Sequence, residues 1–150
     1  MTDDANLTSF TAMLRAALGH RLAPGTKSFA EMFADDGVFE FPYAPPGLAT
    51  AAHGRAEIER HLASLRDFAL DEVSPPLVRP IEGGQDVVIE FEARGRNTRT
   101  GAPYHQRYVS IVEMRGGRIL RYRDYWNPLA VLSAFGGEEE AVGRWQEEGR

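Results

Sequence analysis

Cysteine is missing from all 150 residues of the sequence. Its absence excludes a disulfide framework, thiol catalysis and thiolate metal sites. Long apolar runs are missing as well, since no stretch approaches the roughly 18 apolar residues that a membrane span needs. Residues 1–6 are acidic and polar, unlike a signal peptide. We therefore expect a cytoplasmic protein with no membrane partner.

An excess of positive charge is also missing, because the net charge is −5. A surface that binds nucleic acid is basic, and the cluster formed by Arg94, Arg96 and Arg99 lies beside a turn signal, which favours a solvated hairpin end. The histidines lack zinc spacing, and the sequence has no Asp-rich calcium loop and no Gly-rich phosphate cradle. We expect no nucleic-acid partner, no metal and no cofactor.

Hydrophobic residues recur at helical spacing in three N-terminal segments, which are residues 7–19, a short stretch after Thr26, and residues 55–65. In the third segment Ile58, Leu62 and Leu65 define the inward face. His20 and His61 lie on these helices, and we assign both to the surface. A further helix is predicted to begin at Asn127-Pro128 and to stop near Gly136.

Strand-like alternation dominates the rest of the chain. The predicted strands are residues 38–43, 68–79 (interrupted by Pro75-Pro76), 87–96, 104–114 and 119–126. Asp35-Asp36-Gly37, Gly83-Gly84 and Gly116-Gly117 are predicted turns. Helices gathered on one side of such a sheet predict an α+β fold, with three N-terminal helices on a curved antiparallel sheet that encloses one pocket. A chain of 150 residues fits one domain, with a core of about 7–135 and a charged tail of 138–150.

Four short motifs, in this order, resemble the SnoaL-like branch of the nuclear transport factor 2 superfamily. They are Phe33-Ala34-Asp35-Asp36 before a strand, His53-Gly54-Arg55 at a helix start, Gly116-Gly117-Arg118-Ile119, and Arg123-Asp124-Tyr125-Trp126. The resemblance covers about residues 7–135 and implies a cone-shaped domain. Ketosteroid isomerases, polyketide cyclases, limonene epoxide hydrolases and phenazine-biosynthesis subunits share that fold, which hosts enzymes, binding modules and scaffolds.

The resemblance implies three catalytic positions for a ketosteroid isomerase, and all three are vacant. The position of the base, just before Pro42, holds Phe41. The first helix has no tyrosine, since the first tyrosine of the chain is Tyr43. The second acid would fall at about Val109 or Ser110. Phenylalanine cannot accept a proton, so the pattern argues against steroid isomerisation by the usual mechanism.

The last predicted strand carries the best catalytic candidate. Tyr122, Asp124 and Trp126 share one face by alternation. A carboxyl group between two aromatic side chains is partly desolvated, which raises its pKa and suits it to proton transfer near neutrality. The resemblance implies an acid in this segment, although some relatives carry it three residues later, at Asn127. In the other interpretation, Asp124 points to solvent or pairs with a neighbouring arginine.

His53 is the second catalytic candidate, because it precedes a helix near the expected mouth of the pocket. It can equally be a loop residue without a task. His105 alternates with three predicted pocket-lining residues and is therefore expected on the outer face. The predicted substrate-binding residues are Phe39, Phe41, Tyr43, Tyr104, Gln106, Tyr108, Tyr122 and Trp126. Their aromatic rings favour a flat, mostly apolar small molecule, unless some of them only fill the core.

Two functions remain open at this point. The first is a cofactor-free acid–base enzyme (an isomerase, cyclase or hydratase) that acts on a cyclic or polyketide-like substrate. The second is a non-catalytic ligand-binding or scaffold module. In either case we expect a homodimer through the sheet, because strands 87–96 and 104–114 carry apolar residues on more than one face.

Overall fold

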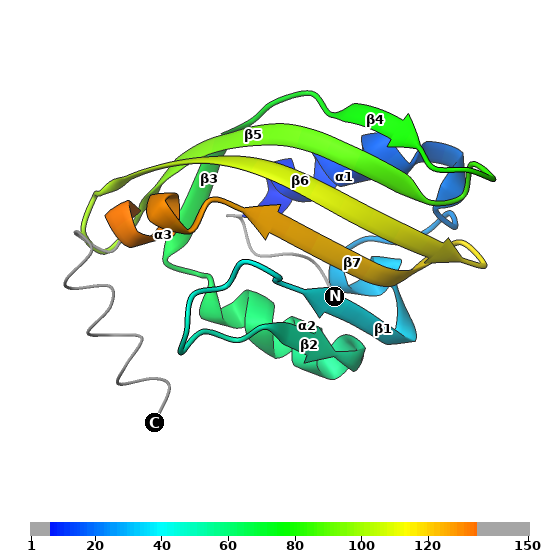
Figure 1. The fold of residues 1–150 in the computed structure, drawn as a ribbon, viewed down its shortest axis with the longest axis horizontal. Coiled ribbons are helices and arrows are strands. Elements are labelled where there is room, and N and C mark those ends of the chain that lie inside the picture. Colours follow the sequence, from blue (N-terminus) through cyan, green and yellow to red (C-terminus); the bar gives the residue numbers. More distant parts are fainter. Residues whose placement is uncertain (1–6, 135–150) are drawn as a thin grey trace.

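The computed structural model describes residues 7–134 and arranges them as a mixed α+β fold (Figure 1). The described α-helices are α1 (Thr8–Leu18), α2 (Gly54–Ser64) and α3 (Pro128–Ala134). The strands are β1 (Phe33–Glu40), β2 (Ala51–His53), β3 (Phe68–Val73), β4 (Leu77–Pro80), β5 (Val87–Asn97), β6 (Pro103–Arg115) and β7 (Arg118–Trp126). The predicted helix stop at Gly136 and the tail of 138–150 lie outside the described residues.

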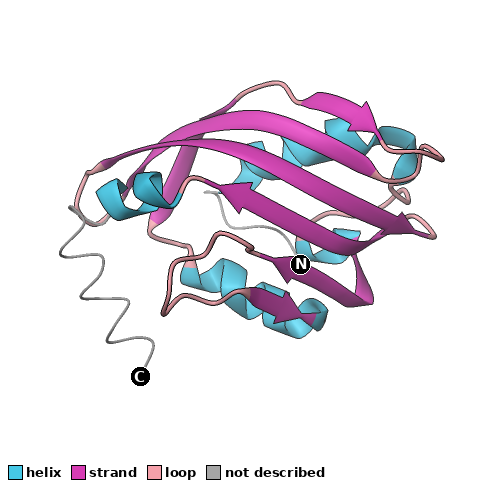
Figure 2. Cartoon of the chain, in the orientation of Figure 1, coloured by secondary structure: helices cyan, strands magenta, loops and turns pink. Residues whose placement is uncertain are grey.

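The seven strands form one curved sheet in the order β2-β1-β7-β6-β5-β3, and β4 adds to one end of β5 (Figure 2). The pairs are antiparallel except for β1 and β7, which run parallel. The long strands β5, β6 and β7 form the predicted meander. The α+β class and the curved sheet are therefore confirmed, and the parallel β1–β7 pair is an addition that the sequence did not indicate.

The core lies between the inner face of the sheet and the helices. The apolar face of α1 contributes Leu14 and Leu18, both fully buried, and these pack with Ile89 and Val112 from the sheet. Phe29 lies at the centre, with the rings of four other aromatic residues at centroid distances of 5.0 to 5.6 Å. Edge-to-face contacts of this kind add to the free energy gained from burial.

Two local predictions need correction. The second N-terminal helix is a single 3₁₀ turn, Ala30–Met32, because β1 begins directly after it. The expected turn at Asp35-Asp36-Gly37 lies inside β1, where the register against β7 shifts between Phe33 and Val38. A β-bulge accommodates the extra residues, so turn-forming residues mark an irregular strand here.

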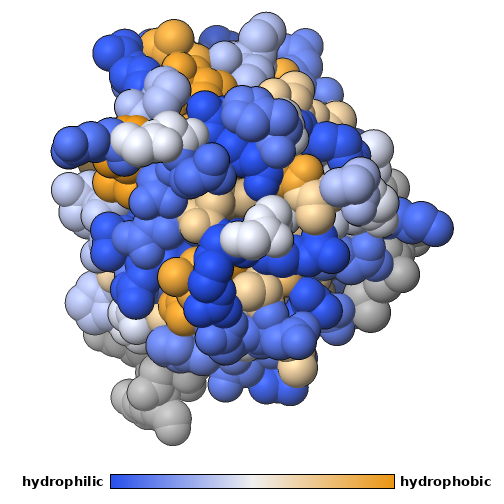
Figure 3. Space-filling model, turned by 90° about the vertical axis from the view of Figure 1, so that its right-hand side faces the viewer, coloured by the Kyte–Doolittle hydropathy of each residue, from blue (hydrophilic) through white to orange (hydrophobic). Residues whose placement is uncertain are grey.

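The end of the molecule opposite α3 carries the β6–β7 turn and is mostly hydrophilic, with small scattered apolar patches (Figure 3). In the part of the chain that the structure describes, no helix is long and apolar enough to cross a membrane.

Candidate functional site

A cavity of about 480 Å³ lies between the inner face of the sheet and α2. Its wall is mostly apolar, and its aromatic residues are Phe39, Phe41, Phe68, Tyr104, Tyr108 and Trp126. Its polar side chains are Asp124, His61, Ser64 and Asp67. A mostly apolar cavity of this size with a few polar groups has the properties of a small-molecule site.

Asp124 lies on β7, opposite Ser110 of β6, and its carboxyl group lines the cavity. Burial raises the pKa of this carboxyl group to about 8, because its apolar surroundings solvate the charged form poorly. No described residue donates a hydrogen bond to it or forms an ion pair with it. Asp124 is thus a half-buried acid whose pKa lies close to physiological pH.

The neighbouring arginines do not neutralise Asp124, because alternation along β7 places them on the outer face of the sheet. There Arg121 forms an ion pair with Glu40, and Arg123 lies 3.6 Å from Glu40 and 3.7 Å from Glu113. The cation nearest in sequence therefore already has carboxylate partners on the opposite side of the strand. This arrangement differs from the alternative interpretation, in which Asp124 paired with an arginine.

His61 lies on α2 and faces the cavity, so its assignment to the surface was wrong. Its imidazole ring stacks on the Phe41 ring, with a centroid distance of 4.4 Å and an interplanar angle of 28°. Burial lowers the pKa of His61 to about 4, and the ring is neutral at physiological pH. The sequence held a signal for this position, since His61 lies three residues after Ile58 and four before Leu65, both on the inward face of the helix.

Tyr104 and Tyr108 form a hydroxyl pair in the cavity wall, with 2.8 Å between their oxygen atoms. Burial raises the pKa of Tyr104 to about 12 and raises that of Tyr108 well above its usual value. Both hydroxyl groups therefore keep their protons. The Tyr108 ring stacks on Phe91 at a centroid distance of 4.7 Å, which fixes its position.

Gln106 and Tyr122 face inward as predicted but do not line the cavity, and this part of the prediction needs correction. Tyr122 is fully buried among core aromatic residues, and its hydroxyl shares a 2.8 Å hydrogen bond with Ser110. The Gln106 amide donates to the Asn127 carbonyl at 2.9 Å and accepts from the Asn127 N–H at 2.7 Å. Both side chains hold the wall together and leave no free group for a ligand.

Tyr43 and His53 lie away from the cavity. β1 ends at Glu40, so the alternation of Phe39 and Phe41 does not continue, and Tyr43 is 60% exposed. The exposed side chain of His53 does not line the cavity. The backbone N–H of His53 donates to the Glu57 carboxylate at 2.7 Å, which caps the start of α2. The structure thus places His53 at a helix start, outside the lining of the cavity.

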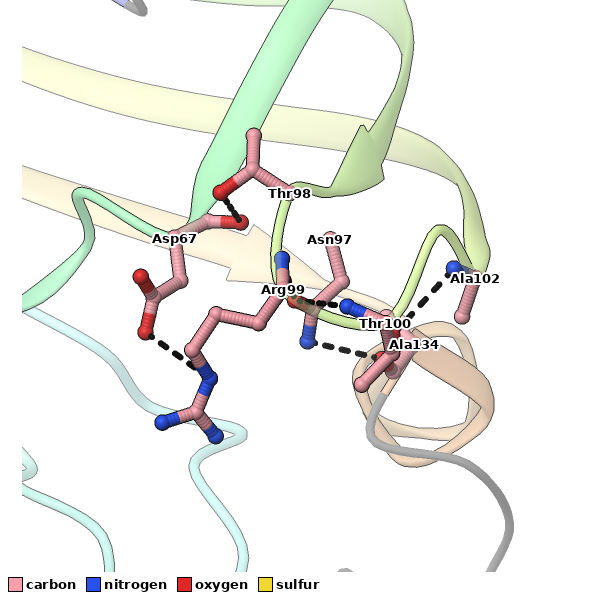
Figure 4. Close-up of polar contacts among 7 residues, drawn as sticks. All are labelled: Asp67, Asn97, Thr98, Arg99, Thr100, Ala102 and Ala134. Carbon is pink, nitrogen blue, oxygen red and sulfur yellow. Dashed lines mark hydrogen bonds and ion pairs between the residues drawn. The ribbon is translucent and has the colours of Figure 1, made fainter.

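Asp67 lies at one side of the cavity and belongs to a polar network that joins three segments (Figure 4). Its carbonyl accepts hydrogen bonds from the N–H and hydroxyl of Thr98, at 2.7 and 3.2 Å. Its carboxylate lies 3.5 Å from the Arg99 guanidinium. Asn97 is buried, and its amide donates to the carbonyl of Ala134 at the end of α3. This network holds α3, which contributes Val131 to the cavity.

The polar groups of the cavity can therefore move one proton and form a few hydrogen bonds. Asp124 can give or accept a proton near neutral pH, while His61 and the tyrosine pair remain neutral and can orient a ligand. In the described residues no group of three or more His, Asp or Glu side chains is placed to hold a metal ion.

Comparison with known proteins gives the family of the chain. The SnoaL-like domain family matches residues 10–122. The protein YesE of Bacillus subtilis is 41% identical over 83% of this chain and 85% of its own length. A PhzA/B-like protein of Pseudomonas aeruginosa is 36% identical over 77% of this chain and 82% of its own length.

A solved structure supports the same assignment. A Bacillus subtilis protein described as a candidate isomerase superposes with a TM-score of 0.71 at 38% identity, over 89% of this chain and 97% of that one. The resemblance seen in the four sequence motifs is thereby confirmed, and the chain belongs to the SnoaL-like domain family.

Proposed function

We propose that the protein is a cofactor-free acid–base enzyme that acts on a flat, hydrophobic, cyclic molecule bound in the cavity. Asp124 is the group that transfers the proton. One observation carries this proposal: Asp124 has no cationic partner among the described residues, lies in an aromatic cavity and has a pKa raised to about 8. An acid or base works best when its pKa lies near the operating pH.

Each cavity residue then has a separate role in the reaction. The aromatic walls hold the ring system of the substrate and exclude water. Asp124 removes a proton from the substrate or gives one to it, and later reverses that transfer. His61 and the Tyr104–Tyr108 pair orient the substrate through hydrogen bonds, since none of the three changes its charge near pH 7. An isomerisation that moves a proton from one carbon of the substrate to another needs only these steps, whereas a cyclisation also forms a bond within the substrate.

The names of the relatives agree with this class of chemistry. One structural relative is described as a candidate isomerase, and one curated relative is named after phenazine-biosynthesis subunits. The vacant positions at Phe41, Val109 and Ser110 still argue against the usual steroid-isomerase mechanism, so any isomerase activity here has to use Asp124.

The experiment is hydrogen–deuterium exchange on a panel of flat bicyclic ketones, followed by NMR in D₂O. The enzyme is expected to speed exchange at the carbon next to the carbonyl for at least one ketone, and Asp124→Asn is expected to remove the acceleration. Glu82→Gln removes an exposed carboxyl group outside the cavity and serves as the control. Equal acceleration by Asp124→Asn and the wild type contradicts the role of Asp124, whereas ligand binding without any acceleration favours the binding-module alternative.

We also propose that two copies pair through the outer face of the sheet. Leu77 and Val109 are 51% and 40% exposed there, and both lie beside Glu90 in the strand register. The Arg79–Glu90 pair puts charges of both signs beside them, so a twofold arrangement can set opposite charges of the two copies against each other. Sedimentation should give twice the 16.7 kDa chain mass, and Val109→Arg should give monomers. A wild-type monomer at micromolar concentration contradicts this proposal.

A further inference from the structure

Two carboxyl groups line the cavity, and they differ in their partners. Asp67 has the Arg99 guanidinium at 3.5 Å. Asp124 has no cation or hydrogen-bond donor among the described residues, although it lines the same cavity as six aromatic side chains. The cavity therefore contains one acid whose negative charge, once formed, has no counter-ion in the described structure.

No described lysine or arginine lines the cavity, which restricts the charge of the ligand. An anionic ligand would find no positive side chain in the wall and would repel the carboxylate of Asp124. An uncharged ligand would leave that carboxylate without a partner. A ligand with a positive charge would supply the missing counter-ion at short range, where the low dielectric of the cavity makes the attraction strong.

The rest of the wall also suits a cation. Trp, Tyr and Phe rings attract ammonium groups through the negative potential of their faces, and the attraction is larger when the site excludes water. Trp126 and Tyr108 are cross-strand partners, and Asp124 lies two residues before Trp126 on β7. The carboxyl group and these aromatic side chains are thus near neighbours on one face of the sheet.

We infer that the ligand of this cavity is a hydrophobic organic cation, whose ammonium group pairs with the Asp124 carboxylate and whose apolar groups pack on the aromatic wall. The inference rests on the cavity named in the proposed function and narrows its ligand class. It also gives the cation a role in the reaction. At pH 7 only about one-tenth of Asp124 is ionised in the empty cavity, and a bound cation converts the rest into the carboxylate that acts as a base.

The proton balance of binding follows from the groups that face Asp124. These are His61 from α2, Tyr104 and Tyr108 from β6, Tyr122 from β7, and Asp67 at the edge of the cavity. His61 is already neutral and the tyrosines stay protonated, while Asp67 already carries an arginine partner. A cation that binds at pH 7 therefore displaces roughly nine-tenths of a proton from Asp124, and at pH 9 only about one-tenth.

Isothermal titration calorimetry with a matched pair of probes tests the inference. Phenyltrimethylammonium and tert-butylbenzene have nearly the same shape and differ in charge. The cation is expected to bind at least about tenfold more tightly. Titrations in buffers with different ionisation enthalpies should show proton release that is large at pH 7 and small at pH 9. Benzenesulfonate, an anion of similar size, should not bind.

Asp124→Asn keeps the shape of the side chain and is expected to remove both the preference for the cation and the proton release, whereas Glu82→Gln should keep both. In the wild type, NMR of the Asp124 carboxyl carbon should also show that its pKa falls when the cation is added. If tert-butylbenzene binds as well as the cation, if no proton is released, or if neither probe binds, the inference is wrong. Deuterium exchange on neutral ketones decides the proposed enzymatic function separately.

Discussion

The two faces of the sheet contain the same kinds of acidic side chain in opposite electrostatic situations. On the outer face, Glu92 accepts a hydrogen bond from His105 at 3.0 Å and lies 3.1 Å from Arg107, and its pKa is lowered. On the inner face, burial raises the pKa of Asp124 to about 8. The comparison shows that water and charged partners, more than residue type, decide whether a carboxyl group can transfer protons near pH 7.

The largest expected effect is on catalysis, where a carboxyl group of the inner face is expected to be essential and one of the outer face is not. Asp124→Asn should reduce deuterium exchange by about 100-fold or more, because the amide cannot accept the proton. Glu113→Gln changes a carboxyl group on the outer face and should leave the exchange rate unchanged. A comparable loss in both variants would mean that the two faces do not differ in the way we describe.

The next effect is on stability and depends on pH. The pKa of Asp124 is about 8 in the folded state and about 3.9 in an unfolded chain. Between these values the unfolded chain binds fewer protons, so the wild type loses stability as pH rises from 4 to 8. Each pKa unit contributes about 1.4 kcal/mol. The amide of Asp124→Asn does not ionise, so this variant does not lose stability through this group as the pH rises. It should be more stable than the wild type by several kcal/mol at pH 8, with a difference near zero at pH 4.

Urea denaturation of both proteins at several pH values measures this difference. Parallel stability curves from pH 4 to pH 8 would show that Asp124 is solvated as well in the folded protein as in the unfolded chain. In that case its comparison with Glu92 would lose its basis.

A smaller effect of opposite sign is expected at His61. Its pKa is about 4 in the folded state and about 6.5 in an unfolded chain. As the pH falls from 6.5 to 4, the unfolded chain therefore binds a proton at His61 that the folded protein does not bind, and the wild type loses stability. His61→Phe keeps an aromatic ring next to Phe41 and should remove this loss, which is worth roughly 3 kcal/mol at pH 4. Thermal melts at pH 4 and pH 7 measure it. His53→Gln changes an exposed histidine and should melt like the wild type at both values.

The smallest effect is expected for an exposed ion pair on the outer face. Arg79 lies 3.5 Å from Glu90, and both side chains are largely exposed. Arg79→Ala should change the free energy of unfolding by less than about 1 kcal/mol, and added salt should reduce the difference further. A loss of several kcal/mol would show that this pair is not the weak, solvated ion pair that its exposure indicates.

Alternation along strands predicted most of the sheet and the placement of Asp124. The period-two pattern of residues 119–126 puts Asp124 and Trp126 on one face, and both side chains line the cavity in the structure. The same reasoning was wrong for Tyr43, because it extended a strand through Pro42, where β1 has already ended. β2 is only three residues long, so it left no periodic pattern to detect.

Periodicity assigns a side chain to a face but does not say what it meets there. Tyr122 and Gln106 face inward as predicted, yet neither is free to contact a ligand. Phe29 packs on the Tyr122 ring at a centroid distance of 5.6 Å, and the Gln106 amide donates a hydrogen bond to the backbone carbonyl of Asn127. Those contacts join segments that are far apart in sequence. His61 was missed for a different reason, because a polar residue on a helix was assigned to solvent although its spacing from Ile58 placed it on the buried face.

The most direct test of this account is the titration of Asp124 itself. NMR of carboxyl carbons in protein labelled with ¹³C-aspartate, with Asp124→Asn to assign the signal, follows ionisation between pH 3 and pH 10 without a ligand. We predict a midpoint near 8 for Asp124. A midpoint near 4, the ordinary value for an aspartate, would contradict the account, because the carboxyl group would then be well solvated and have no special capacity for proton transfer.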